Sequence, residues 1–360
     1  MRVISPLTVA RAGILLLGLS VALPAPLLAA PQTSKTPSKT TKTTTAKTKK
    51  PAYSASKSTA RKARLARARA AARAREQARL RSLRALREAM TPRYKTDAAG
   101  SLVPDVRAAA AIIFDPETGH VLWEENGSDK RSIASITKVM TAVVFMEGSP
   151  DLSREVTIER GDVYAASTTY LRANERVTLD NLLHLTLIAS DNAAARALAR
   201  LSQGGSAAFI ERMNEKALEL GLENTSFADP SGLNPNNISS AYDLSRLITY
   251  AASDERISGI MRKASYSVKT SRRTLTIKNT NHLVRGGDVT VMEVMGGKTG
   301  FISKAGYCLA TLLRLPQTNQ QVAVVVLGAS SNNGRFWETR HLFNWLSDKT
   351  TELFRKDQQD

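Results

Sequence analysis

The chain has 360 residues, with 51 lysine and arginine residues against 32 aspartate and glutamate residues, and a formal net charge of +19. Residues 31–95 alone carry +18 and residues 96–360 carry about −1, so the charge does not indicate a body that binds nucleic acid. The single cysteine, Cys308, excludes an intrachain disulfide, and the four widely separated histidines lack zinc-ligand spacing. We therefore expect neither a metal site nor a cofactor.

Residues 1–30 have the pattern of a secretory signal peptide. Arg2 and Arg11 provide a positive n-region, residues 13–23 form a short apolar run, and Ala29 and Ala30 offer a cleavage site. The apolar run is short for a bilayer span, although an uncleaved anchor is the alternative. The pattern predicts an exported protein of the periplasm or cell envelope.

Residues 31–104 form a basic segment of low complexity. Its first part, 31–59, is rich in Thr, Lys, Ser and Pro and cannot bury enough apolar surface to order itself. Residues 60–90 consist largely of Ala, Arg and Leu, which favour a charged helix that ends near Pro92. Because an exported protein meets anionic envelope surfaces rather than nucleic acid, we expect this arm to bind the former; a solvated tether is the alternative.

The globular body spans residues 105–350 and is followed by a polar tail, 351–360. Buried strands are predicted over 108–114 and 120–125, joined by a turn at 115–119. A helix begins near Ser135, a mixed region covers 152–175, and a helical stretch over 179–201 is broken around Ser190. Further helices are predicted over 206–220, 241–252, 257–262 and 333–346, a strand over 266–278, and a hairpin of strands over 306–314 and 321–329. Strands near both ends with helices between them indicate an α/β body.

Ser135 and Lys138 are the first candidate pair for catalysis. Residues at i and i+3 share one helix face, so a hydroxyl and an amine would lie side by side at a helix N-terminus, where developing negative charge is favoured. That pairing suits a serine nucleophile and its base. The spacing alone is weak evidence, because a second copy, Ser54 to Lys57, lies in the linker.

Two more short motifs follow in the body. Ser190, Asp191 and Asn192 stand at the break between two helical runs, and Lys298, Thr299 and Gly300 lead into the apolar hairpin. Each is weak evidence alone: Ser-x-Asn recurs at 330–332 and 331–333, although Lys-Thr-Gly occurs once. The ordered set Ser-x-x-Lys, Ser-x-Asn and Lys-Thr-Gly is far more specific.

This ordered set resembles the penicillin-recognising serine enzymes, and most closely the low-molecular-mass D-alanyl-D-alanine peptidases of the penicillin-binding protein 7 type. The resemblance covers nearly all of residues 105–346 and rests on four segments: 133–138, 279–284, 298–301 and 305–309. It implies a β-lactamase/transpeptidase-like α+β fold, in which a five-stranded antiparallel sheet flanked by helices meets a helical subdomain at the site.

The resemblance also implies a role for each motif residue. Ser135 would be acylated, Lys138 would be its base, and Ser190 would relay a proton to the leaving amine. Desolvation and the nearby charge of Lys298 would keep Lys138 neutral. The remaining residues would bind substrate, namely Asn192, Lys298, Thr299, Gly300 and Phe301, with the backbone N–H groups of Ser135 and Phe301 forming the oxyanion hole. Substrates would be D-Ala-containing peptidoglycan peptides, and β-lactams would inhibit.

Three other functions remain as alternatives. A β-lactamase would need a carboxylate to activate the deacylating water; the loop 227–234 has no glutamate, leaving only Asp229 and nearby Glu223. A non-enzymatic envelope-binding protein would not need the intact trio of motifs. A D-alanyl-D-alanine carboxypeptidase of this family would carry a further β-rich domain and an amphipathic C-terminal helix, whereas this chain stops at Asp360, so we expect an endopeptidase. His282 and Cys308 are interpreted as structural residues.

Overall fold

The computed structural model describes residues 55–285 and 292–357. The predicted signal peptide, the linker up to residue 54 and the last three residues of the tail lie outside this part of the chain. The chain divides into two units, Met1–Arg69 and Ala70–Asp360, and the first contributes only the start of helix α1 (Ala55–Met90) to the described residues. Among the described residues, no helix combines the length and apolar character needed to cross a membrane.

Helix α1 confirms the predicted Ala/Arg-rich helix and begins five residues earlier than expected. All side chains from residue 61 to 88 are exposed, as expected for a helix that is polar on every side. Its end is fixed by Thr91, whose Oγ1 donates to the Arg87 carbonyl oxygen at 2.8 Å. Beyond that point, Arg107 donates to the Glu88 carbonyl oxygen at 2.7 Å.

The centre of the second unit is an antiparallel five-stranded sheet in the order β11-β12-β13-β3-β4. Its strands are β3 (Ala110–Phe114), β4 (Val121–Glu125), β11 (Glu293–Ile302), β12 (Gly306–Arg314) and β13 (Gln321–Ala329). The two N-terminal strands therefore pair with three C-terminal strands, which confirms a sheet built from both ends of the body. β11 lies at one edge and carries the Lys-Thr-Gly motif.

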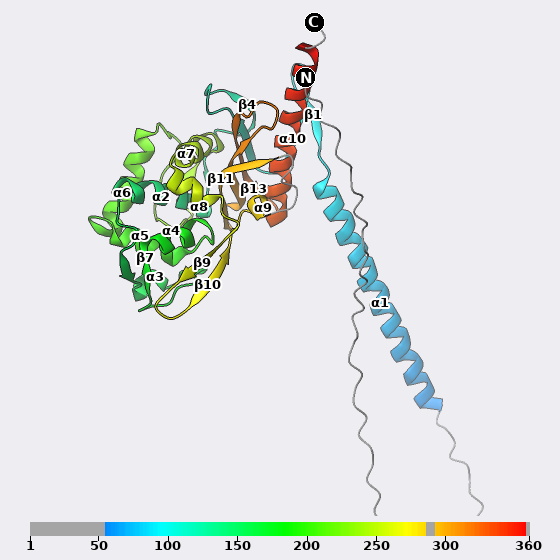
Figure 1. The fold of residues 1–360 in the computed structure, drawn as a ribbon. Helices are drawn as coiled ribbons and strands as arrows, with labels where there is room; N and C mark the ends of the chain where they lie inside the picture. Colours follow the sequence, from blue (N-terminus) through cyan, green and yellow to red (C-terminus); the bar gives the residue numbers. More distant parts are fainter. Residues whose placement is uncertain (1–54, 286–291, 358–360) are drawn as a thin grey trace, which may run out of the picture. The chain divides into compact units, whose positions relative to one another are not determined.

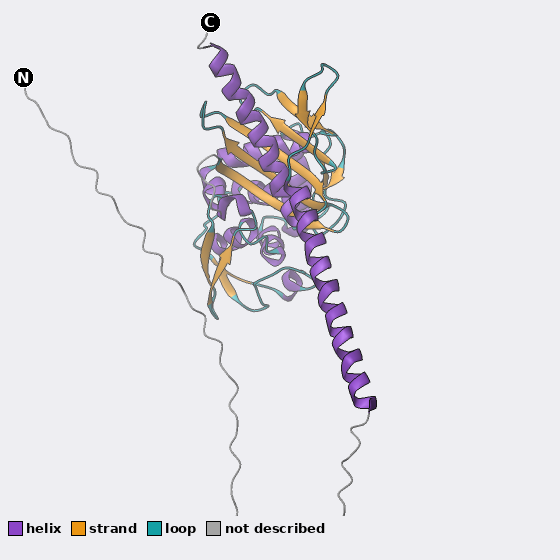
Figure 2. Ribbon diagram, turned by 90° about the vertical axis from the view of Figure 1, so that its right-hand side faces the viewer, coloured by secondary structure: helices purple, strands orange, loops and turns teal. Residues whose placement is uncertain are grey.

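Helices cover both faces of this sheet, as Figures 1 and 2 show. Helix α10 (Asn332–Asp357) packs on β12 and β13 from one side, and α7 (Ala241–Ser253) packs on β3, β12 and β13 from the other. The alternating side chains of the central strands are buried on both faces: Val324 and Val326 face α10, and Ala323 and Val325 face the larger core that includes α7. This arrangement confirms the α+β fold class predicted from the sequence.

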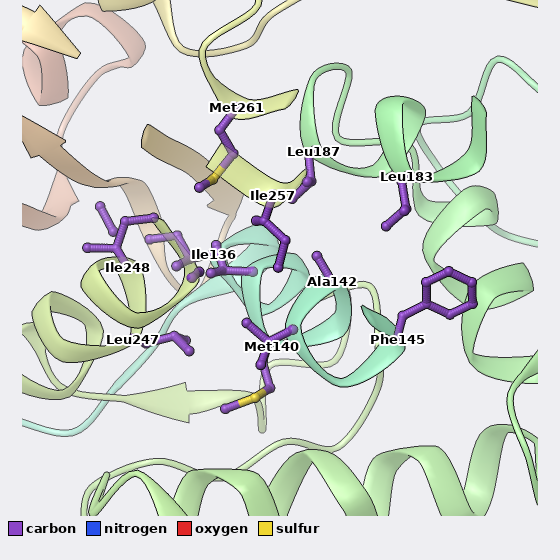
Figure 3. Packing of buried hydrophobic residues seen from close by; sticks show 14 of the residues in the cluster. Ile136, Met140, Ala142, Phe145, Leu183, Leu187, Leu247, Ile248, Ile257 and Met261 are labelled. Carbon is purple, nitrogen blue, oxygen red and sulfur yellow. The ribbon is translucent and has the colours of Figure 1, made fainter. Parts of the chain in front are cut away.

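The larger core lies between the sheet and a group of helices around the Ser-x-x-Lys segment. The 3-10 helix η1 (Ala134–Thr137) and α2 (Lys138–Glu147) run through its middle, where Ile136 and Met140 are surrounded by apolar side chains from neighbouring helices (Figure 3). The other elements of the body are β1 (Tyr94–Thr96), β2 (Leu102–Pro104), β5 (Arg131–Ser132), β6 (Glu155–Thr157), α3 (Arg160–Val163), β7 (Arg176–Thr178), α4 (Leu179–Leu187), α5 (Asn192–Leu201), α6 (Gly205–Glu219), β8 (Ile238–Ser239), α8 (Glu255–Met261), β9 (Ser265–Lys269), β10 (Thr274–Lys278) and α9 (His282–Arg285).

Several short elements were not predicted, among them β1, β2 and α9, and three further elements differ from the sequence prediction. The single strand expected over 266–278 is a hairpin, because Thr270 and Arg273 close a turn between β9 and β10. Strand β11 was not predicted, since glycines at 296, 297 and 300 weaken a strand pattern. Helix α10 continues eleven residues past the predicted end at 346.

Candidate active site

Ser135 lies in η1, directly before α2. The preceding residue, Ala134, has a φ of 48°, in the left-handed region that side-chain-bearing residues rarely adopt. Two glycines approach this turn closely: a Cβ on Gly232 would lie 2.1 Å from the Ala134 carbonyl oxygen, and one on Gly300 would lie 2.6 Å from the Ile133 carbonyl oxygen. The turn that carries Ser135 is therefore held between the loop after α6 and strand β11.

Lys138 is fully buried and its Nζ contacts three oxygen atoms. It donates to Ser135 Oγ at 3.0 Å, to Asn192 Oδ1 at 2.6 Å and to the Ser231 carbonyl oxygen. Burial is the main cause that lowers the pKa of Lys138 to about 7; Asp229 and Asp191 oppose this shift, while Arg196 adds to it. A substantial fraction of Lys138 is therefore a neutral amine near neutral pH, in contact with the hydroxyl of Ser135.

Ser190 pairs with the second buried lysine, Lys298. The Lys298 Nζ donates to Ser190 Oγ and to the Thr299 carbonyl oxygen, each at 2.9 Å. Burial lowers the pKa of Lys298 well below its ordinary range, and the charges of Lys138 and Arg335 lower it further. Burial is the largest cause at both lysines. Because the repulsion between two ammonium groups is mutual, a charge on either lysine also disfavours the charged form of the other.

Asp191 and Asn192 connect the Ser-x-Asn motif to the neighbouring loop 164–175. The Asn192 side chain donates to the Ala166 carbonyl oxygen at 2.7 Å, and its backbone N–H donates to the Thr168 carbonyl oxygen at 3.0 Å. The buried carboxylate of Asp191 accepts from Thr169 Oγ1 at 3.0 Å and also from the N–H of Tyr170. These bonds fix the loop as one wall of the site.

The three motifs meet around one cleft of about 570 Å³. Ser135, Ser190 and Asn192 line it together with Thr299, Gly300 and Phe301 from β11, and the wall loop contributes Ser167 and Thr168. Thr299 and Phe301 are two residues apart in β11 and therefore lie on the same face of the strand. Thr299 Oγ1 donates to Thr280 Oγ1 at 2.7 Å. Lys138 and Lys298 lie beneath the surface of the cleft, behind the two serines.

Arg335 is a cleft residue that the sequence analysis missed. It comes from α10, and its Nη1 donates to the carbonyl oxygens of Gly300 at 2.9 Å and Cys308 at 3.2 Å. Burial lowers its pKa to about 10, so it remains cationic at neutral pH. Among the described residues, no carboxylate lies within ion-pair distance of this guanidinium. Only the long-range packing of α10 brings it here, and no local pattern signals that.

Asp229 is the hydrogen-bonding centre of the loop that presents Ser231 and Gly232. Its Oδ1 accepts from Ser231 Oγ at 2.7 Å and from the Gly232 N–H at 2.7 Å, and its Oδ2 accepts from Asn237 Nδ2 at 3.1 Å and from the Asn234 N–H. Burial alone would raise the pKa of Asp229, but these bonds outweigh it and lower the pKa. Both carboxylate oxygens of Asp229 are therefore engaged in hydrogen bonds within the loop.

His282 and Cys308 occupy structural positions. The His282 ring stacks on Phe336 with ring centroids 4.8 Å apart, and Cys308 is fully buried within β12. Among the residues that the structure describes, no three or more His, Cys, Asp or Glu side chains cluster in a way that could hold a metal ion.

Comparison with known proteins decides the family. The sequence model of peptidase family S11, described as D-alanyl-D-alanine carboxypeptidase, matches residues 96–331. The chain belongs to this family. A D-alanyl-D-alanine endopeptidase of Escherichia coli strain K12 is 32% identical to it over 247 residues, which are 68% of this chain and 78% of that protein.

A second relative and a solved structure are also similar to this chain. The D-alanyl-D-alanine carboxypeptidase DacF of Bacillus subtilis strain 168 is 31% identical over 70% of this chain and 65% of its own length. The crystal structure of the Streptomyces K15 DD-transpeptidase superposes with a TM-score of 0.62 at 29% identity, covering 67% of this chain and 97% of that one. This S11 peptidase therefore shares its fold with a DD-transpeptidase.

Proposed function

We propose that this S11 peptidase hydrolyses D-alanyl cross-links of peptidoglycan through an acyl-enzyme on Ser135. The observation that carries the proposal is the 3.0 Å contact between Ser135 Oγ and the Nζ of a buried lysine whose pKa is about 7. A serine hydroxyl is a weak nucleophile until a base takes its proton, and an ordinary lysine is protonated at neutral pH. Burial lowers the pKa of Lys138, so that the neutral amine is available to take the serine proton.

The acylation step follows from these contacts. Neutral Lys138 accepts the proton of Ser135 as Oγ bonds to the carbonyl carbon of D-Ala. The C–N bond then breaks, and the proton on Lys138 passes through Ser190 to the departing amine, which leaves Lys138 neutral; Lys298 holds Ser190 in place at 2.9 Å. Water subsequently attacks the ester, the bond between the acyl carbon and Oγ breaks as Oγ takes a proton from that water, and Ser135 is regenerated.

The oxyanion of each tetrahedral intermediate lies between two backbone donors in this mechanism, the N–H groups of Ser135 and Phe301. The close approach of Gly300 to the Ile133 carbonyl supports this assignment, because it brings the end of β11 against the turn that carries Ser135. Each such donor is worth about 3–4 kcal/mol of transition-state stabilisation.

A substrate carboxylate complements the positive charges of the cleft. Arg335 is a buried cation without a carboxylate partner among the described residues, and Thr299 adds a hydroxyl to the same cleft. A carboxylate bound here would also favour the charged form of Lys298. The residue on the amine side of the scissile bond carries such a carboxylate, both in a terminal D-Ala and in a D-alanyl cross-link.

Endopeptidase activity is preferred over carboxypeptidase activity because the relative from Escherichia coli, of which this chain covers 78%, is named an endopeptidase. The carboxypeptidase from Bacillus subtilis supports the alternative. Purified cross-linked muropeptides separate the two: release of monomers is expected, whereas removal of only the terminal D-Ala from pentapeptides would contradict the assignment. Ser135→Ala should abolish both cleavage and labelling by a fluorescent penicillin. A wild-type protein that takes no label would instead be a binding protein.

Penicillin should act as a lasting inhibitor rather than a substrate. None of the described residues that line the cleft is a carboxylate, Asp229 is committed to its loop, and Glu223 is exposed. Without a carboxylate to activate water, the penicilloyl ester should persist. Rapid turnover of a chromogenic cephalosporin would favour a β-lactamase instead.

We also propose export to the periplasm and retention there by the basic segment 31–95. The exposed arginines along α1 support this, because each basic residue near an anionic surface contributes about 1 kcal/mol. Replacing residues 31–85 by an uncharged Gly/Ser stretch of equal length keeps the contacts of Arg107. We expect unchanged cleavage of soluble muropeptides but weaker co-sedimentation with sacculi or anionic vesicles at low salt. Equal co-sedimentation of both proteins would make the arm a linker only.

A further inference from the structure

An exposed aromatic side chain stands at the rim of the cleft. Phe301, directly after the Lys-Thr-Gly motif, is 50% exposed and lines the cleft. It is opposite Tyr307 in the β11–β12 register, and the two rings stack with centroids 4.2 Å apart and planes 24° apart. This pair, named here the rim stack, presents a supported aromatic surface to whatever occupies the cleft.

The rim stack lies beside Arg335, the cleft cation that has no carboxylate partner in the described part of the chain. The guanidinium carbon of Arg335 lies 5.7 Å from the centroid of the Tyr307 ring and 5.0 Å from that of the Phe336 ring. Tyr307 therefore contacts Phe301 and also lies within cation–π range of Arg335. An anionic group near Arg335 and an apolar group on Phe301 would be neighbours in one ligand.

The two substrates of this family differ in the group that would reach this surface. A terminal D-Ala carries a methyl beside its carboxylate. In a cross-link whose amine comes from a diamino dicarboxylic acid, the carbon that bears the amine carries both a carboxylate and an aliphatic chain. With the carboxylate near Arg335, a methyl is too short to cover a neighbouring aromatic ring, whereas a chain of several methylenes can lie across it and remove apolar surface from water.

We propose that the rim stack is the specificity site for the amine-side residue of a cross-link, with the face of Phe301 packing against its aliphatic chain. This inference rests on the proposed endopeptidase function and names the substrate group that the site selects. Exposure alone does not single out Phe301, because Tyr164 is 75% exposed but does not line the cleft. What distinguishes Phe301 is its place in the cleft, its stacking on Tyr307 and the cation beside that ring.

The test compares two substrates in the full-length protein. Values of kcat/KM are measured for a cross-linked muropeptide dimer and for a monomeric pentapeptide, in wild type, Phe301→Ala, Phe301→Leu and Phe301→Tyr. Loss of the ring should lower the ratio of dimer to pentapeptide kcat/KM about tenfold in Phe301→Ala, mainly through KM for the dimer. Phe301→Tyr keeps the ring and should keep the ratio. Tyr250→Ala is the control for loss of an exposed aromatic side chain outside the cleft, because Tyr250 lies on α7 and is 41% exposed.

The outcomes separate this inference from the function on which it rests. If wild type cleaves the dimer but Phe301→Ala lowers both kcat/KM values equally, the endopeptidase assignment stands and the specificity site is wrong. If wild type trims pentapeptides and leaves dimers intact, the endopeptidase assignment fails, and the inference fails with it. Melting temperature and the stoichiometry of penicillin labelling check that each variant is folded. If Phe301→Ala is not folded, the ratio of kcat/KM values is taken from Phe301→Leu instead.

Discussion

The Nζ atom of Lys138 lies 3.0 Å from the Oγ atom of Ser135. The contact arises because the 3-10 turn before α2 places position 135 over the first residue of that helix, where the lysine is buried completely. Burial lowers the pKa of Lys138 to about 7, so the amine changes between its charged and neutral forms within the physiological range.

The rate of acylation of Ser135 should therefore rise with pH and level off above the pKa of Lys138. Only the neutral amine can accept the serine proton, and below the pKa its fraction falls about tenfold per pH unit. The measurement is the rate of labelling by a fluorescent penicillin across the range around neutral pH. Lys138→Arg, which stays protonated throughout, should lower the rate about 10²–10⁴-fold. Equal rates one unit below and one unit above pH 7 would contradict the assignment of the base.

A second prediction concerns the close approach of Gly232 to the serine turn. Gly232 has a φ of +82°, and an added Cβ would lie 2.1 Å from the Ala134 carbonyl oxygen. Gly232→Ala should displace Ser135 and lower the acylation rate about 100-fold, the effect of a misplacement of roughly 1 Å. Gly119→Ala is the matched control, because Gly119 has a φ of +76° and nothing within 4 Å of an added Cβ. Similar rates in the two variants would mean that the contact does not position the serine.

Much of this site could be predicted from the sequence because its motifs are local. Ser135 and Lys138 are three residues apart, and Ser190 stands at a helix break that the apolar pattern reveals. Strands β12 and β13 are apolar enough to be evident on both faces. The positions of these motifs along the chain, together with the family resemblance, were sufficient to bring them to one cleft.

What could not be predicted depends on long-range packing or on residues with weak patterns. Arg335 reaches the cleft from α10 only once that helix has packed on the sheet, and nothing in its neighbouring residues distinguishes it from a surface arginine. Strand β11 contains three glycines, so neither alternation nor β-propensity marked it. The commitment of Asp229 to its own loop depends on a fold of that loop which a Pro- and Asn-rich sequence leaves open.

The wall loop 164–175 supplies a third prediction through the buried residue Glu175. Its carboxylate accepts from the Arg172 N–H at 2.8 Å and from Thr270 Oγ1 at 3.4 Å, and lies 3.7 Å from the Arg273 guanidinium, which joins the loop to the β9–β10 hairpin. Glu175→Gln should destabilise the fold by about 1–3 kcal/mol and slow acylation by loosening the wall. The surface variant Glu155→Gln should change neither chemical denaturation nor labelling. Unchanged labelling in Glu175→Gln would show that the wall does not depend on this anchor.

The last prediction links Asp229 to both stability and the base. Asn at this position cannot accept the hydrogen bonds that both carboxylate oxygens accept from the loop, so Asp229→Asn should lower the free energy of unfolding by about 1–3 kcal/mol at neutral pH. Because folding lowers the pKa of Asp229, its stabilising effect is present above the unfolded value near 3.8 and is lost as the pH falls through the folded pKa. The difference between wild type and variant should therefore shrink at acid pH.

The same substitution should change catalysis in a direction that misfolding would not produce. The negative charge of Asp229 raises the pKa of Lys138, so its removal should shift the rising limb of the acylation rate to lower pH. Glu223→Gln is the control, because the Glu223 side chain is exposed. It should change neither the denaturation midpoint nor the pH at which the acylation rate rises. A limb that stays at the same pH in Asp229→Asn, in protein shown to be folded by its melting temperature, would mean that the charge of Asp229 does not act on the base.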